Sequence, residues 1–204
     1  MNDLRVRQLT TPQLRGIELT IAPGERVGIS GPSGSGKSLL LRALADMDPF
    51  EGRITLGDDG VHSMPAPRWR RRVALLPAAS AWWHDTVGPH FRQFEAPDYA
   101  ALGFPAKVET WEIRRLSSGE KQRLALLRFL ALRPEVLLLD EPTANLDKEN
   151  TLLAEALISE YGRTSGASML WVSHDVEQLK RLCARAFRME AGRLTPLFDG
   201  KGDE

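Results

Sequence analysis

The chain has 204 residues, of which 42% are hydrophobic and 26% charged, which is typical of one globular domain with a substantial core. Basic and acidic residues number 27 each, so the formal net charge is zero and no basic excess favours a nucleic-acid partner. The single cysteine, Cys183, excludes an internal disulfide, and no apolar run approaches the roughly 18 residues that cross a bilayer. We therefore expect a cytoplasmic protein.

The N-terminal part predicts two strands and a helix that flank a glycine-rich loop. Residues 17–21 alternate apolar and polar side chains, which is the period of a half-buried strand. A turn separates them from a second predicted strand at 26–30, and a helix-forming apolar segment spans 39–45, directly after the loop. Strand, glycine loop and helix thus follow one another in the order that a phosphate-binding loop requires.

The middle of the chain combines a short strand, an irregular segment and one long helix. Residues 73–76 form a short apolar strand. Three prolines interrupt any long helix between residues 78 and 110, so we expect short helices and loops there. Residues 117–131 predict a helix with leucines along one face.

The C-terminal part alternates strands and helices. Residues 136–139 are a continuous apolar run, as expected for a central parallel strand that is buried on both faces. A helix at 150–161 and a buried strand at 168–172 follow, and residues 187–195 predict a hairpin. This alternation predicts an α/β fold with a mostly parallel core sheet.

The segment GPSGSGKS fits the pattern of a P-loop. Its glycines let backbone N–H groups surround phosphates, and the helix that follows adds the positive end of its dipole. Lys37 would contact the β- and γ-phosphates, and the Ser38 hydroxyl would ligate Mg²⁺. The alternative is a glycine-rich turn without a ligand. The candidate nucleotide-binding residues here are Gly31, Pro32, Ser33, Gly34, Ser35, Gly36, Lys37, Ser38 and Leu39.

Two carboxylates follow the apolar strand at 136–139. A carboxylate at the C-terminal end of such a strand lies where ligands bind in open α/β sheets. There Asp140 can hold the Mg²⁺ shell, while Glu141 is placed to orient or deprotonate a water that attacks the γ-phosphate. The alternative is the start of an ordinary loop.

The sequence resembles the ATP-binding cassette of ABC transporters through four segments in one order: GPSGSGKS (31–38), LSSGE (116–120), VLLLDEP (136–142) and SHD (173–175). The resemblance covers nearly the whole chain. It implies a P-loop NTPase fold with N-terminal antiparallel strands and a short helical subdomain that carries the LSSGE signature. It also implies that the protein hydrolyses ATP with Mg²⁺.

The resemblance assigns further site residues. Ser117 and Gly119, in a signature that usually reads LSGGQ, would bind the γ-phosphate of an ATP held by the opposite subunit. Residues 144–147, ending at Asp147, look like the loop that crosses the dimer interface. His174 resembles the switch histidine that touches the γ-phosphate, so Lys37, Glu141 and His174 are the candidate catalytic residues.

The same resemblance implies an assembly. Two copies would form a homodimer around two ATP molecules and work with separate transmembrane permease subunits, on the inner face of the cell membrane. Residues 1–204 would be one ATPase domain. Its catalytic core would comprise 1–77 and 123–204, and its helical insert 78–122. Substrate and direction of transport would depend on the membrane partner.

The sequence departs from the family pattern at three places. Ala78 stands where the family has a glutamine that senses Mg²⁺ and the γ-phosphate, and we hypothesise that water or Ser80 replaces part of that role. Residues 1–28 contain no aromatic residue to stack on adenine, which predicts weak discrimination between ATP and GTP. In the signature, Ser118 and Glu120 replace glycine and glutamine.

Two smaller features have alternative interpretations. Trp82 and Trp83 either anchor a membrane partner or form the small core of the insert. The arginines at 68 and 70–72 either contact phosphate or a membrane surface, or belong to a solvated entry to a strand.

Three other functions compete with the transporter subunit. A soluble ATP-driven clamp would have long coiled-coil insertions or two cassettes, which the chain lacks. A regulatory scaffold that signals through a membrane partner fits the cassette equally well. A non-hydrolysing ATP binder is disfavoured because both Glu141 and His174 are present.

Overall fold

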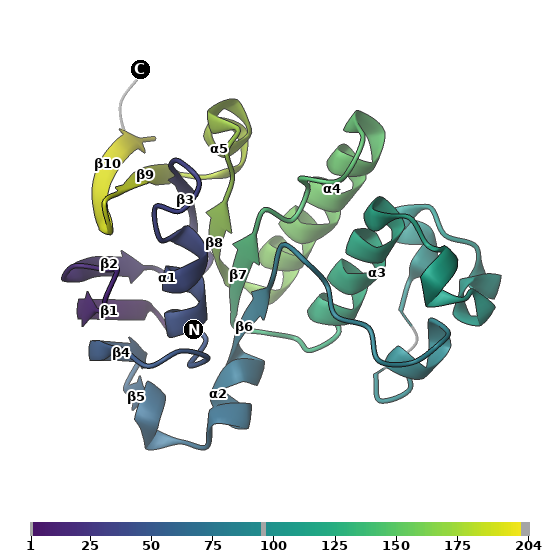
Figure 1. Cartoon of the computed structure of the whole chain (residues 1–204), viewed down its shortest axis with the longest axis horizontal. Helices are drawn as coiled ribbons and strands as arrows, with labels where there is room; N and C mark the ends of the chain where they lie inside the picture. Colours follow the sequence, from purple (N-terminus) through teal and green to yellow (C-terminus); the bar gives the residue numbers. More distant parts are fainter. Residues whose placement is uncertain (1, 95–96, 201–204) are drawn as a thin grey trace.

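The computed structural model describes residues 2–94 and 97–200, which form two sheets and a set of helices (Figure 1). The larger sheet has six strands in the order β10-β9-β3-β8-β7-β6. Its strands are β3 (Arg26–Ser30), β6 (Val73–Leu76), β7 (Val136–Asp140), β8 (Ser168–Val172), β9 (Arg185–Glu190) and β10 (Arg193–Asp199). The predicted strands and the hairpin between β9 and β10 are confirmed.

Five strands of this sheet run parallel, and only β10 is antiparallel, at one edge. Ile29, Val172 and Asp140 lie in register on neighbouring strands. The loops that leave the carboxyl ends of β3, β7 and β8 therefore emerge side by side, where ligands bind in open α/β folds. The predicted α/β class with a mostly parallel core sheet is confirmed.

The smaller sheet is antiparallel, in the order β2-β1-β4-β5. It consists of β1 (Leu4–Thr10), β2 (Ile17–Ile21), β4 (Glu51–Leu56) and β5 (Asp59–Gly60), of which the sequence predicted only β2. Helix α1 (Lys37–Leu44) lies between the two sheets. Its Leu40, Leu41 and Leu44 are fully buried against apolar side chains of both sheets, which fixes the start of α1 at the end of β3.

The opposite face of the parallel sheet is covered by α3 (Ser118–Leu130), α4 (Lys148–Ser165) and α5 (Val176–Leu182). Alternate residues of β7 serve the two faces, since Leu138 packs on the α1 side and Leu137 and Leu139 on the α3 side. None of the helices in residues 2–94 and 97–200 is long and apolar enough to cross a membrane.

The segment before α3 contains only short 3₁₀ helices among its described residues, as the prolines predict. They are η2 (Gly88–His90), η3 (Tyr99–Leu102), η4 (Ala106–Thr110) and η5 (Ile113–Arg115), and η1 (Val61–Ser63) lies earlier in the chain. Buried side chains of the segment before α3, including Val87, Leu102 and Val108, pack with α3 and α4 in one apolar cluster, whereas Val61 of η1 belongs to the cluster around α1.

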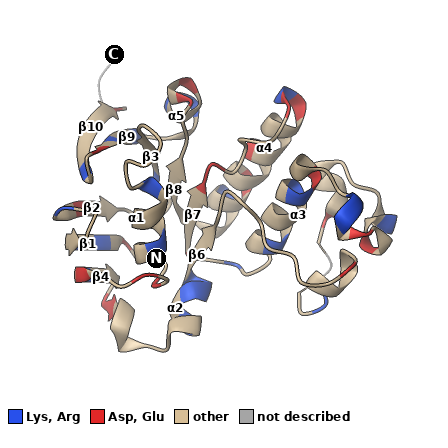
Figure 2. Ribbon diagram, in the orientation of Figure 1, with Lys and Arg blue, Asp and Glu red and all other residues tan. Residues whose placement is uncertain are grey.

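The arginine cluster at 68–72 stands at the entry to a strand, as one of the two interpretations expected. It belongs to a helix, α2 (Ala66–Arg72), that leads directly into β6 and carries a visible concentration of basic residues (Figure 2). Arg72 pairs with Glu135 and Asp59 at 2.5 and 2.6 Å, and Arg70 donates to the carbonyl of Asp46. These contacts tie α2 to its neighbours, while Arg68, Arg70 and Arg71 are exposed to solvent, which agrees with the interpretation as a solvated entry to a strand.

Candidate functional site

The glycine loop between β3 and α1 forms a cradle lined by backbone. Gly31, Gly34 and Gly36 have positive φ, and a Cβ on Gly31 would collide with the carbonyl oxygen of Met189. Pro32, Ser33 and Gly34 are exposed, but the Ser35 Oγ is buried and has no hydrogen-bond partner among the described residues. A buried hydroxyl without a partner fits a site that is completed by a polar ligand.

Lys37, the first residue of α1, folds back into this cradle. Its Nζ donates to the carbonyl oxygens of Gly31 and Pro32, both at 2.9 Å, and only 6% of the residue is exposed. Burial lowers the pKa of Lys37, while the nearby carboxylates of Glu141 and Asp140 act in the opposite direction. The ammonium thus lies in the loop beside neutral acceptors that phosphate oxygens would replace.

Two carboxylates stand at the end of β7. Asp140 is the last residue of the strand and is 8% exposed. Glu141 follows with φ at 50°, a conformation that costs a non-glycine residue on the order of 1–3 kcal/mol. Its amide donates to the Val172 carbonyl at 3.1 Å, which fixes the turn to β8. The strained turn places the Glu141 side chain beyond the sheet edge, toward the loop that follows β8.

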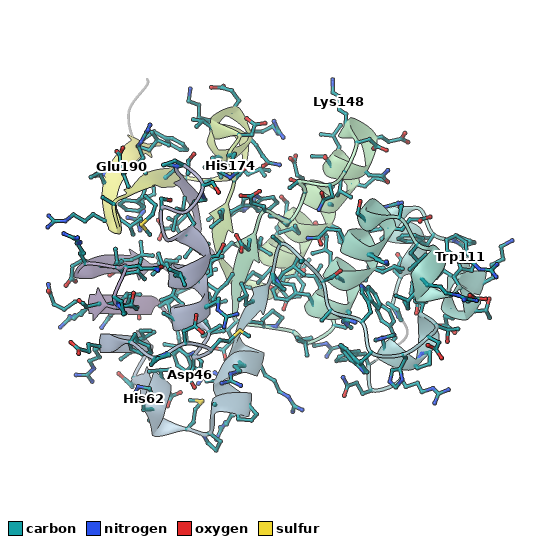
Figure 3. The ribbon with its side chains drawn as sticks, viewed as in Figure 1. Asp46, His62, Trp111, Lys148, His174 and Glu190 are labelled. Atoms are coloured by element: carbon teal, nitrogen blue, oxygen red, sulfur yellow. The ribbon has the colours of Figure 1, made fainter. Side chains whose placement is uncertain are left out.

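His174 lies on that neighbouring loop (Figure 3). The amide of Ser173 donates to the Ile29 carbonyl at 3.1 Å, and His174 Nε2 is 2.8 Å from Glu141 Oε1. His174 is half-exposed. The sheet therefore brings Lys37, Glu141 and His174, which are far apart in the sequence, to adjacent loops at one edge.

The two residues predicted to hold Mg²⁺ fit a site in which nucleotide phosphates and water supply the other ligands, rather than a site formed by protein ligands alone. Ser38 lies exposed in the first turn of α1, and Asp140 ends β7. Within the described part of the chain, no group of three or more His, Cys, Asp and Glu side chains could hold a metal. Mg²⁺ typically takes one or two protein ligands and completes its shell with substrate phosphates and water, which suits this pair.

The LSSGE signature begins α3. Ser117 is its N-cap in a capping box, accepting from the Glu120 amide at 3.2 Å while its own amide donates to Glu120 Oε2 at 2.8 Å. A Cβ on Gly119 would lie 3.0 Å from the Asn145 carbonyl, so the helix tip is packed on the segment after Glu141. Ser118 is exposed and has no positive φ.

The structure does not bring the signature to the P-loop of its own chain. Helices α1 and α3 pack on opposite faces of the parallel sheet, and no bond joins Ser117 or Gly119 to residues 31–38 within the described residues. Asp147 caps α4 by accepting from the Asn150 amide at 2.8 Å, and these hydrogen bonds lower its pKa. Both helix tips are exposed toward the outside of the molecule.

The departure at Ala78 lies on an exposed loop that follows β6 and Pro77. Ser80, which we hypothesised to replace part of the glutamine role, accepts a hydrogen bond from Trp82 Nε1 at 3.0 Å. Within residues 2–94 and 97–200 its hydroxyl donates to no acceptor, and the hypothesis stays a prediction.

The two tryptophans differ in burial, so the interpretation as core fits Trp82 and the interpretation as an exposed anchor fits Trp83. Trp82 packs on the core, 4.8 Å from the His90 ring and 4.4 Å from the Arg128 guanidinium. Trp83 is 61% exposed and borders a groove of about 290 Å³ that also includes Leu76 and Phe129. Burial lowers the pKa of Arg128 to about 10. Trp82 therefore packs against the apolar cluster that also includes residues of the parallel sheet, while Trp83 presents its ring to the surface.

Sequence reasoning missed a buried polar cluster behind the site. Gln178 of α5 contacts Thr143, Ser173 and Glu155, and all of these bonds are 2.9 Å or shorter. Because the four residues come from four separate segments, no spacing in the sequence could have grouped them. The only local signal is Ser173, which lies within the SHD segment.

Comparisons with known proteins agree with this geometry. The sequence profile described as ABC transporter matches residues 14–144. An aliphatic sulfonates import ATP-binding protein of Nocardia farcinica is 39% identical over 194 residues, covering 91% of this chain and 74% of the relative. A hemin import ATP-binding protein of Pseudomonas aeruginosa is 33% identical over 213 residues, covering 95% and 83%.

Solved structures share the fold. A bacterial Atm1-family ABC exporter with ATP bound superposes with a TM-score of 0.82 at 24% identity, over 95% of this chain and 38% of that one. A dimeric ATP-binding cassette in a post-hydrolysis state, with ADP and Pi, gives 0.77 at 20% identity, over 98% and 100%.

Proposed function

The chain belongs to the ABC transporter family of ATP-binding proteins and is an ATPase, and from this we propose that it dimerises around two ATP molecules and drives transport through separate membrane subunits. The observation that carries the proposal is the meeting of Lys37, Glu141 and His174 at one sheet edge, with 2.8 Å between Glu141 Oε1 and His174 Nε2. We propose that it works peripherally, on the inner face of the cell membrane.

The residues at this edge have separate roles in ATP hydrolysis. Lys37 leaves the carbonyls of Gly31 and Pro32 to bind the β- and γ-phosphates, and backbone amides of the loop bind the remaining oxygens. Ser38 and Asp140 would hold Mg²⁺, which neutralises phosphate charge. Glu141 orients and deprotonates the attacking water, and His174, held by Glu141 in this structure, then contacts the γ-phosphate.

A second copy completes the site. Since α3 and α1 cover opposite faces of the sheet, Ser117 and Gly119 face away from their own P-loop and are free to approach a partner's ATP. The segment ending at Asp147 lies beside that helix tip, as its contact with Gly119 requires. Loss of the γ-phosphate would then loosen the dimer and turn hydrolysis into movement.

The groove beside Trp83 is the proposed docking site for a membrane subunit. Its apolar lining and one large exposed aromatic suit an anchoring contact at a protein interface. Trp83→Ala should reduce the amount of membrane subunit that co-purifies with the chain. Leu152→Ala, which removes another exposed apolar side chain, from α4, is the matched control and should leave co-purification unchanged.

We propose import as the direction, because the sulfonate and hemin relatives are both named import proteins. Because their named substrates differ, we propose that the membrane partner determines the substrate class. A soluble clamp is disfavoured, since the described part of the insert has only short 3₁₀ helices before α3.

Reconstitution with its membrane subunits in vesicles tests this function against the signalling scaffold. A transporter couples ATP hydrolysis to flux of substrate across the membrane, and Lys37→Ala should abolish both. ATP hydrolysis that responds to the partner without any flux would instead support the scaffold.

A further inference from the structure

Gln178 occupies a buried position at the start of α5, with 5% of the residue exposed. The Ser173 hydroxyl donates to its Oε1 at 2.7 Å, and its Nε2 donates to Thr143 Oγ1 at 2.9 Å and to Glu155 Oε1 at 2.7 Å. Both N–H groups of the amide and its oxygen are thus used. Arg181 donates to both oxygens of Glu155 at 2.7 and 2.8 Å, so this buried carboxylate is paired with a guanidinium.

The chemistry of the neighbours fixes the orientation of this amide. Glu155 is 4% exposed and can only accept hydrogen bonds, so the amide must turn its nitrogen toward it. The oxygen then faces Ser173, whose hydroxyl donates to it and also accepts from the Asp175 amide at 3.0 Å.

These bonds join the two loops that carry the candidate catalytic pair. Ser173 directly precedes His174, and Thr143 lies two residues after Glu141. The backbones of these loops are held independently by sheet-edge bonds, from Glu141 to Val172 and from Ser173 to Ile29. Gln178 therefore links, through its side chain, two loops whose backbones are already fixed by hydrogen bonds at the sheet edge.

We propose that Gln178 is a positioning residue, which keeps Glu141 and His174 in contact by linking Thr143 to Ser173 through its amide. The proposal rests on the roles proposed above for Glu141 and His174. It differs from a packing role because the amide's donors, rather than its volume, make the link.

Gln178→Glu tests the link without a change in volume. The carboxylate has no donors, so the bond to Glu155 is lost, and repulsion between the two carboxylates moves the side chain away from the Thr143 hydroxyl. We expect kcat to fall on the order of tenfold to a hundredfold with KM for ATP unchanged, since displacement of a catalytic group by about 1 Å has such an effect. Glu177→Gln, an exposed neighbour on the same helix, is the matched control and should leave kcat unchanged.

A charge exchange provides the rescue. In Gln178→Glu combined with Glu155→Gln, the new glutamine supplies an N–H to the new carboxylate, and the Thr143 and Ser173 hydroxyls can both donate to it. We expect this double variant to regain most of the lost kcat. A purely structural residue would gain thermal stability in the double variant without any recovery of kcat per folded molecule.

Nitrogen NMR of the histidine side chains supplies a readout that needs no nucleotide. The signal of His174 is identified because it is absent from the His174→Gln variant. We expect the His174 Nε2 signal to move toward that of a solvated imidazole in Gln178→Glu and to return in the double variant. If Gln178→Glu does not fold, Thr143→Val removes one bond of the same link and should shift the signal in the same direction. An unmoved signal together with unchanged kcat would overturn the proposal. Full turnover in Glu141→Gln would instead overturn the proposed function, which separates the two failures.

Discussion

The side chain of Glu141 stands out among the acidic residues of the chain because its backbone is strained and its carboxylate meets a histidine. Its φ of 50° is retained only because the bond from its amide to Val172 and the parallel strands fix the turn. Backbone strain of this kind is common at functional sites, where a side chain must be held in one direction.

Replacement of this carboxylate by an amide should stop turnover while leaving binding intact. We expect Glu141→Gln to lower kcat by about 10²–10⁴, the contribution of a positioned general base, with ATP affinity retained. Steady-state ATPase assays measure the effect. Glu160→Gln, which removes the same charge from an exposed position on α4, should behave as wild type. Retained turnover in Glu141→Gln would contradict its role as the base.

Cys183, which follows the last residue of α5, should be inert in the folded protein. It is 8% exposed, and burial raises the pKa of its thiol to about 12. Since only the thiolate reacts and its fraction grows as pH rises toward that pKa, a disulfide reagent should react slowly at pH 8 and faster at higher pH. In denaturant the same thiol should react at once and with one equivalent. Immediate reaction of the native protein at pH 8 would contradict the burial.

Nucleobase selectivity should be weak. The segment between β1 and β2 contains no aromatic ring, and its Leu14 is fully buried, so it presents no ring for stacking on a base. The lost stacking is worth roughly 1–3 kcal/mol, so ATP and GTP should bind within about tenfold of each other. Competition against a fluorescent nucleotide measures this. A strong preference for ATP by the isolated chain would refute it.

At the level of elements, β6, β7 and β8 were predictable because each is mainly a short apolar run, but β1 was not. Leu4 and Val6 face the core at a spacing of two, and a bulge then shifts the register so that Leu9 is the next residue inward. The break in alternation removes the strand signal. Gln8, within this bulge, has φ at 51°.

Helix α2 was missed for a different reason. Pro65 and Pro67 suggest a break, yet they stand at the N-cap and in the first turn, where a missing N–H costs nothing. Only Trp69 is buried on this helix, and its indole donates to the Leu44 carbonyl at 2.9 Å. Helix α4 extends past the predicted 150–161 because Asp147 caps its start and Gly166 ends it.

The hairpin of β9 and β10 offers an element-scale prediction. Gly192 has φ at 74°, and a Cβ there would collide with the Gln13 backbone, while the Arg15 amide donates to the Gly192 carbonyl. Gly192→Ala should lower the free energy of unfolding by at least 1 kcal/mol, which urea denaturation measures. Gly60→Ala, with φ at −79° and open space around its Cβ, should be neutral or slightly stabilising. Equal stability of both variants would contradict the packing of the hairpin on 13–15.

At the scale of the whole molecule, the sequence predicted the parts of the site that are contiguous in the chain. The P-loop, the pair at 140–141 and His174 each follow a recognisable strand, and parallel strands bring their ends to one edge. The link through Gln178 could not be predicted, because it depends on how α4 and α5 pack behind that edge. The exposure of Trp83 likewise depends on how Arg128 and His90 order the loop.

The separation of the signature from its own P-loop leads to the central claim, that two copies close around two ATP molecules. Light scattering of Glu141→Gln with saturating Mg-ATP tests it most directly, because hydrolysis cannot then release the dimer. We predict a doubling of molar mass that depends on ATP and is lost when Lys37→Ala is added. A Glu141→Gln protein that binds Mg-ATP and yet stays monomeric, both alone and with its membrane subunits, would contradict the account.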